Sequence, residues 1–68
     1  MTVGERIVKF REQLGITQAE LARQAGLSRQ CVHKYESDAC DPKLFNAACI
    51  ADALGITLDE LAGRDDYE

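Results

Sequence analysis

The segment TQAELARQAGLSRQCVHKY, from Thr17 to Tyr35, contains the clearest helix and turn signals in this chain. Thr17 and Glu20 form a T-x-x-E capping box, which opens helices because each member bonds a backbone N–H left unpaired at the helix start. Gly26 occurs where a tight turn requires a positive φ angle. Ser28 is a good N-cap, because its hydroxyl can accept a hydrogen bond from a backbone N–H. The segment therefore predicts two short helices, 17–25 and 28–36, joined by a turn.

The rest of the chain is also helical in pattern. Apolar residues at helical spacing predict a helix over 2–14, and Pro42, which suits a first helical turn, opens another that runs to 54. Thr57 and Glu60 form a second capping box before a short fifth helix. The expected inward-facing residues of these three helices are Val3, Ile7, Phe10, Leu14, Leu44, Ala47, Ala48, Ala51, Leu54, Leu58 and Leu61.

The sequence predicts an all-α fold, because no segment alternates with the two-residue period of a half-buried strand. We expect one domain over residues 1–63 and an acidic tail over residues 64–68. No apolar run approaches the roughly 20 residues of a membrane span. The N-terminal segment MTVGERIVKF carries an acidic side chain and does not read as a signal peptide. These features predict a cytoplasmic location.

The three cysteines, Cys31, Cys40 and Cys49, are an odd number with no C-x-x-C pair. This pattern argues against a disulfide framework and for a reducing compartment. A metal site is not expected, since His33 is the only histidine and the sulfurs are nine residues apart. Cys40, in an expected loop, is a candidate redox sensor; the alternative is that all three cysteines are small buried hydrophobes.

No catalytic pattern stands out in the sequence. His33 has no nucleophile or carboxylate at helical reach except Cys31, which faces elsewhere. We find no phosphate-binding loop and no paired carboxylates. The sequence therefore predicts neither an enzyme nor a cofactor, and no small-molecule ligand is evident.

The net charge of −4 is unevenly distributed along the chain. Residues 1–36 hold six basic and four acidic side chains, a balance of +2, whereas residues 37–68 hold two basic and eight acidic ones, a balance of −6. Such asymmetry suggests one end that faces a polyanion and one acidic far end. Counts this small also vary by chance, so charge alone does not decide.

The expected helix 28–36 has an unusual polar face. At about 100° per residue, Arg29, Gln30, His33 and Lys34 share one arc, opposite an apolar arc. The polar arc contains no acid, whereas an ordinary solvated face mixes both signs. Arg and Gln can each bond a base edge with two hydrogen bonds, and Lys or His can reach guanine or a phosphate. Together with the preceding helix, this spacing is typical of a helix-turn-helix, whose second helix enters the major groove of DNA.

Several motifs together carry a family resemblance. They are "GITQAELA", Gly26, "LSRQ", "KYE", Pro42 and "IADALGITLDELAG". As a set they resemble the lambda-repressor-like helix-turn-helix domains of bacterial and phage regulators, over about residues 3–62. The resemblance implies five helices, with the second and third forming the DNA-binding unit.

The resemblance also implies roles for individual residues. Gln18, at the start of the second helix, would contact phosphate. The expected DNA-binding residues are Thr17, Gln18, Ser28, Arg29, Gln30, His33, Lys34 and Lys43. Arg11 and Glu36 would form an ion pair that ties the first helix to the end of the third; the alternative is two unrelated solvated charges.

The chain departs from this family in two regions. The loop after Glu36 carries Asp38 and Asp41 where many relatives are basic, so we expect repulsion of phosphate and a shallow salt dependence. Phe45 and Cys49 fall outside the expected core arc of the fourth helix, which suggests a contact surface. The alternative is that they pack under the loop or under the tail that contains Tyr67. Helix five would add contacts to such an interface through Leu58 and Leu61.

These observations predict a small sequence-specific DNA-binding regulator, with a repressor as the favoured type. One recognition helix reads only a few base pairs, so a homodimer on a palindromic site is expected. The alternative is a protein-interaction module on the same fold that binds little DNA, which the acidic loop and Phe45 favour.

Overall fold

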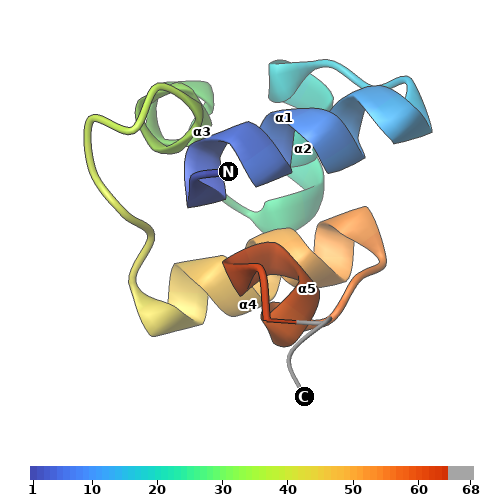
Figure 1. The fold of residues 1–68 in the computed structure, drawn as a ribbon. Coiled ribbons are helices and arrows are strands. Elements are labelled where there is room, and N and C mark those ends of the chain that lie inside the picture. Colours follow the sequence, from blue (N-terminus) through green and yellow to red (C-terminus); the bar gives the residue numbers. More distant parts are fainter. Residues whose placement is uncertain (65–68) are drawn as a thin grey trace.

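The computed structural model describes residues 1–64 as five helices. In chain order these are α1 (Val3–Leu14), α2 (Gln18–Ala25), α3 (Arg29–Glu36), α4 (Leu44–Leu54) and α5 (Leu58–Ala62). Helices α1, α2 and α3 form the upper part of the molecule in Figure 1, and α4 and α5 lie below them. The described residues contain no strand, so the predicted all-α fold of five helices is confirmed. Residues 65–68, which include Tyr67 and most of the expected acidic tail, lie outside the described part of the chain.

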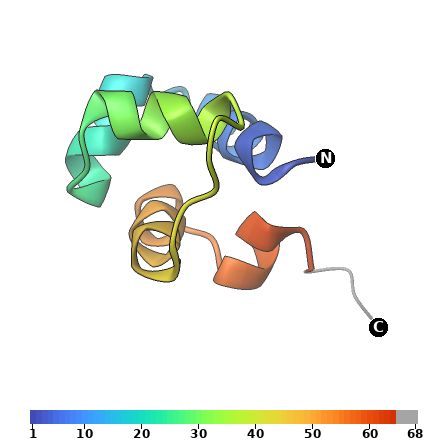
Figure 2. The same cartoon turned by 90° about the vertical axis from the view of Figure 1, so that its left-hand side faces the viewer.

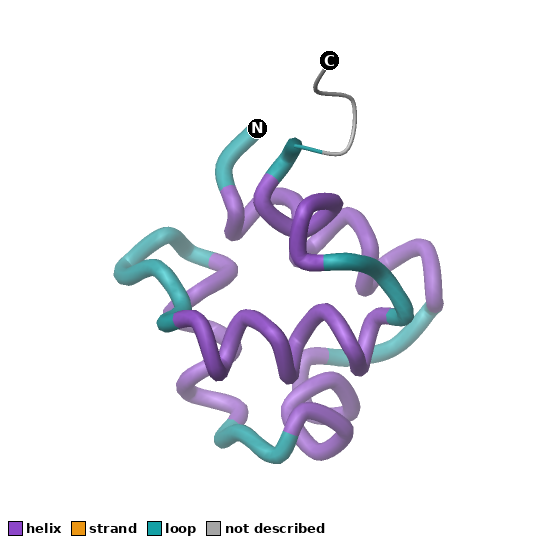
Figure 3. The backbone as a smooth tube through the Cα atoms, turned by 90° about the horizontal axis from the view of Figure 1, so that it is seen from below, coloured by secondary structure: helices purple, strands orange, loops and turns teal. Residues whose placement is uncertain are grey.

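Local sequence signals set most of the helix ends. The Thr17–Glu20 and Thr57–Glu60 capping boxes are both present, as predicted. A third box, between Thr2 and Glu5, starts α1 and was not predicted. Gly26 ends α2 with a φ angle of 73°, in the left-handed region that glycine enters without steric cost. This turn lets α3 leave α2 at a steep angle, and Figure 3 shows the short loops that join the helices.

Pro42 lies outside α4, contrary to the prediction. The helix begins at Leu44, and its N-cap is Lys43, whose backbone is extended with a ψ angle of 162°. Helical geometry therefore starts one residue after Lys43, and Pro42 belongs to the loop 37–43.

The core is made of apolar side chains from all five helices. Helix α2 packs against both α3 and α4, and α1 packs against α3 and α5. The buried apolar residues are Ile7, Leu21, Ala22, Ala25, Val32, Tyr35, Ile50, Ala51, Leu54 and Leu61. Ala22, a small residue of α2, is among them.

Three expected core positions are exposed instead. Leu14 is 52% exposed, Leu44 is 76% exposed and Leu58 is 40% exposed. Each is an end residue of its helix. Helical periodicity gives the direction of such a side chain, but not whether a neighbouring helix extends far enough to cover it.

None of the helices in residues 1–64 has the length and apolar character that a membrane crossing demands.

Candidate nucleic-acid interface

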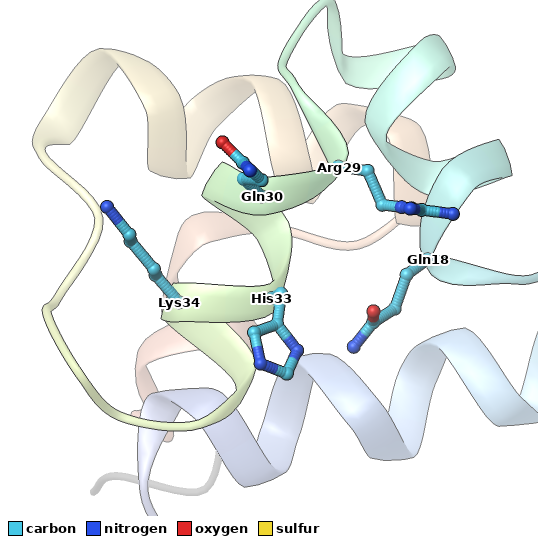
Figure 4. Close-up of a pocket in the computed structure, with 5 residues that line it drawn as sticks. All are labelled: Gln18, Arg29, Gln30, His33 and Lys34. Atoms are coloured by element: carbon cyan, nitrogen blue, oxygen red, sulfur yellow. The ribbon is translucent and has the colours of Figure 1, made fainter.

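One face of α3 forms an open, polar surface. Five side chains line a shallow pocket of about 580 Å³: Gln18, Arg29, Gln30, His33 and Lys34. Figure 4 shows Arg29 and Gln18 on the side of α3 near α2, whereas Lys34 extends toward the loop that leads to α4. The structure thus brings together five of the eight residues that the sequence indicated for DNA binding.

The local sequence explains why α3 presents these side chains outward. The Ser28 hydroxyl accepts a hydrogen bond from the Cys31 N–H at 3.1 Å and so caps the helix. Val32 and Tyr35 are buried on the inner face. Arg29 and Gln30 are left on the exposed face of the first turn, which contains no acidic residue.

The Arg11–Glu36 ion pair expected from the resemblance is present. The Arg11 Nε–H donates to Glu36 Oε2 at 2.8 Å and its Nη2 donates to Oε1 at 3.2 Å, a bidentate arrangement. Arg11 Nη1 also donates to the carbonyl of Ile16 at 2.9 Å. The hydrogen bond to Glu36 raises the pKa of Arg11 above its ordinary value. These contacts fix the C-terminal end of α3 against α1 and against the start of α2.

Gln18 takes part in the same network, which the sequence did not indicate. Its Nε2 donates to Glu36 Oε1 at 2.8 Å. An amide nitrogen carries two N–H donors, so a side chain held by Glu36 can still donate to a phosphate. Glu36 therefore orients a residue at the rim of the polar pocket.

The three other expected DNA-binding residues lie outside the pocket. The Thr17 hydroxyl accepts from the Glu20 N–H, and the Ser28 hydroxyl accepts from Cys31, so both act as helix caps. Lys43 is exposed at the start of α4, where no side chain caps the helix. The positive end of a helix beside a lysine favours a bound anion.

The acidic loop is arranged differently from what the sequence suggested. Asp38 was expected to repel phosphate near the path of DNA. Instead, its Oδ2 accepts from the Thr2 hydroxyl at 2.8 Å and its Oδ1 accepts from the Gly4 N–H at 3.2 Å. A carboxylate is favourable at the start of a helix, where the dipole is positive. Asp41 lines a separate groove beside α5, not the pocket on α3. These contacts show what holds Asp38 in place, and the shallow salt dependence stays a prediction.

The four residues expected at an interface fall into different environments. Phe45 is 77% exposed and Leu58 is 40% exposed. Leu61 is only 2% exposed and belongs to the core, so its assignment to an interface is wrong. Cys49 is partly buried against the core, which contradicts its placement outside it. Leu61 is buried because α5 packs against both α1 and α4, a long-range contact that helical periodicity does not reveal.

Tyr35 links α3 to α4. Its hydroxyl accepts a hydrogen bond from Asn46 Nδ2 at 2.8 Å. A hydrogen bond with Cys31 raises the pKa of the tyrosine, and the Asn46 bond opposes that effect. Cys31 is half-buried, whereas Cys40 is exposed. Asn46 carried no recognisable signal in the sequence, because its partner is on another helix.

The helix-turn-helix family matches residues 7–61 of the chain. The cryptic phage CTXphi transcriptional repressor RstR of Vibrio cholerae is 42% identical over 64 residues, which cover 94% of this chain and 57% of the relative. The immunity repressor protein of Bacillus phage phi105 is 38% identical over 65 residues, covering 96% of this chain and 45% of the relative. The chain thus spans about half the length of these two curated relatives.

Solved structures share the same arrangement of helices. The P22 c2 repressor, in complex with a synthetic operator, superposes with a TM-score of 0.89 at 31% identity, covering 96% of this chain and 98% of that protein. The restriction-modification controller protein C.AhdI of Aeromonas hydrophila superposes with a TM-score of 0.84 at 34% identity, covering 87% and 89% of the two chains. The chain therefore belongs to the helix-turn-helix family of DNA-binding transcription regulators and has the lambda-repressor-like fold.

Proposed function

We propose that this chain is a transcriptional repressor that inserts α3 into the major groove of double-stranded DNA and binds a palindromic site as a homodimer. The observation that carries the proposal is the polar face of α3, where Arg29, Gln30, His33 and Lys34 stand exposed beside the start of α2. Two relatives named as phage repressors, and the P22 c2 repressor solved with an operator, support it.

The side chains of this face suit different parts of the DNA. Arg29 suits the O6 and N7 acceptors of guanine, and Gln30 suits N6 and N7 of adenine. Lys34 and His33 would reach guanine or a backbone phosphate. Gln18, held by Glu36, and Lys43, at the start of α4, would fix the position of the domain on the phosphates.

The homodimer follows from the size of the reading surface. An α3 helix of eight residues contacts only a few base pairs. Two copies on half-sites about one helical turn apart double the contacts and make the site palindromic. We further propose that residues 1–63 act as one DNA-binding domain in the cytoplasm, without catalysis and without a cofactor.

Selection of bound duplexes from a random oligonucleotide pool tests this function. The wild-type chain should enrich a palindromic motif. The double variant Arg29→Ala, Gln30→Ala should lose it, because it lacks two side chains proposed to contact base edges. Both side chains are exposed, so their removal leaves the core intact. The absence of any enriched motif at low salt would count against DNA recognition.

The second candidate function is a protein-interaction module on the same fold. Phe45 favours it, because a side chain that is 77% exposed and apolar suits a protein contact. The variant Arg29→Glu separates the two candidates by charge reversal. It should abolish function if the chain is a DNA-binding repressor, and it should have little effect on function if the chain is a protein-interaction module.

A further inference from the structure

Two of the three cysteines lie around the same side chain. Cys31 precedes Tyr35 by four positions on α3, a spacing that places two side chains on one face of a helix. The hydrogen bond with Cys31 raises the pKa of Tyr35, so the Cys31 sulfur lies beside the tyrosine hydroxyl. The charge of Cys40 raises the same pKa through space. Thiols from α3 and from the loop that follows it are therefore both near this hydroxyl.

The backbone explains why the loop thiol lies near α3. After the helix ends the chain turns back, and the Ala39 N–H donates to the Lys34 carbonyl at 3.0 Å. Because Ala39 is held there, the next residue, Cys40, lies beside the last turns of α3 and not beyond their end. Figure 2 shows this loop at the end of α3, before it descends to α4.

The two thiols differ in exposure in the way that a redox-sensing pair requires. Cys40 is exposed, so a peroxide in solution can reach it, whereas Cys31 is half-buried against the core. Cysteines that sense oxidants are accessible and often lie next to a second, resolving cysteine. Cys49 is also half-buried, but it lies on α4.

We propose that Cys31 and Cys40 form a site of oxidative modification, in which hydrogen peroxide joins them in a disulfide that weakens the binding of α3 to DNA. The Cys40 thiolate attacks the O–O bond, which gives a sulfenic acid on Cys40 and a hydroxide that takes up a proton. The Cys31 thiolate then attacks the Cys40 sulfur and displaces a second hydroxide, which also leaves as water. The peroxide is reduced, and two thiols become one disulfide. A thiol reductant reverses the reaction.

The position of Cys31 explains the effect on DNA binding. Cys31 lies about 60° from Lys34 around the helix, at the border of the polar face, and Figure 4 shows Lys34 extending toward the same loop. A disulfide holds its two Cα atoms about 4.4–6.8 Å apart, so it fixes the loop against the first turn of α3, which carries Gln30. Asp41 directly follows Cys40. The disulfide therefore brings a carboxylate toward the side that would face the phosphates.

This effect on DNA rests on the proposed function, whereas formation of the disulfide does not. The two parts therefore need separate readouts, one without DNA and one with it.

Peptide mapping by mass spectrometry after treatment with hydrogen peroxide tests the disulfide. Cleavage after lysine and arginine places the three cysteines on separate peptides, 30–34, 35–43 and 44–64. The oxidised wild type should yield peptides 30–34 and 35–43 joined, with two hydrogen atoms fewer than the free pair, and dithiothreitol should separate them. Cys31→Ser and Cys40→Ser should each lose the joined product. Cys49→Ser, which removes the other half-buried thiol, is the matched control and should retain it.

Circular dichroism should show equal helix content in all the reduced proteins, so that a missing product reports the thiol and not the fold. Several results would overturn the proposal. They are a Cys40–Cys49 link, a disulfide found only between two chains, a Cys40 sulfinic acid without any cross-link, and persistence of both thiols in reduced form.

Fluorescence anisotropy on a selected duplex measures the effect on DNA. The oxidised wild type should bind about tenfold more weakly than the reduced protein, the size of loss expected when one base contact is removed. Dithiothreitol should restore binding, and peroxide-treated Cys40→Ser should bind as its reduced form does. Equal affinity of the disulfide form and the reduced form would overturn the effect on DNA. Absence of DNA binding by the reduced protein would refute the proposed function instead, and the disulfide would still be read from the peptide map.

Discussion

Glu36 accepts two hydrogen bonds from Arg11, at 2.8 and 3.2 Å, and this pair joins the first helix to the end of the third. The side chain of Glu36 is 5% exposed and that of Arg11 is 16% exposed. A third hydrogen bond, from Gln18, converges on the same carboxylate. The pair therefore controls both the placement of α3 and the orientation of a side chain at the rim of its polar face.

Arg11→Ala should destabilise the fold strongly, because it leaves the Glu36 carboxylate largely buried without its cation. We expect a loss of about 3 kcal/mol in the free energy of unfolding, the low end for removal of one partner from a buried pair. Urea unfolding followed by circular dichroism measures it. Glu12→Ala, an exposed change one residue along α1, is the control and should stay within about 0.5 kcal/mol of wild type. Equal effects of the two substitutions would show that the pair contributes little.

Gly4→Ala should also destabilise the chain, by about 1–3 kcal/mol. A Cβ atom at this position would lie 2.5 Å from the carbonyl oxygen of Tyr35 and 2.6 Å from Asp38 Oδ1. The nearest atom belongs to the backbone of α3, so relief requires α1 and α3 to separate. Thermal unfolding of Gly4→Ala beside Gln13→Ala, an exposed change on the same helix, tests this prediction. An unchanged melting temperature for Gly4→Ala would mean that the two helices separate at no cost.

The stability of α2 should depend on pH through Glu20. Hydrogen bonds from Thr17 lower the pKa of Glu20 below its ordinary value of 4.5. A lowered pKa in the folded state means that the stabilisation is present above the unfolded-state value and is lost as the pH falls through the folded-state value. Urea unfolding at a series of acidic pH values should show this loss in wild type. Glu20→Gln, whose amide oxygen can still accept from Thr17, should have a weaker dependence over that window, and an identical pH profile would contradict the assignment.

Arg29 and Lys43 should affect DNA binding in different ways. Arg29→Ala should weaken binding to the selected site by about 1–3 kcal/mol and relax the base preference at one position, as expected for a side chain that reads a base edge. Lys43→Ala should weaken binding to all duplexes similarly and reduce the salt slope by about 1, as expected for a phosphate contact. Fluorescence anisotropy titrations at several salt concentrations, on selected and scrambled duplexes, separate the two. A uniform loss for both variants would argue that Arg29 contacts only phosphate.

The features that depend on neighbours along the chain could be predicted from the amino-acid sequence. Capping boxes and terminal glycines act within one turn, so the helices and most of their ends could be predicted. The polar and apolar faces of α3 follow from helical periodicity alone. The side chains of the polar face could therefore be identified from the sequence. The Arg11–Glu36 pair came from the family resemblance, since its members are 25 positions apart and no local pattern connects them.

The packing of the helices against one another sets which side chains are covered and which polar groups meet. Leu44 and Leu61 both lie on apolar arcs, yet one is exposed and the other buried, because only the packing of α5 determines how far the core extends. Asp38 follows α3 in the sequence, yet only the fold shows that it lies at the start of α1, 34 positions from its partner Gly4. Contacts of this kind depend on the arrangement of whole helices, which no pattern within a single helix specifies.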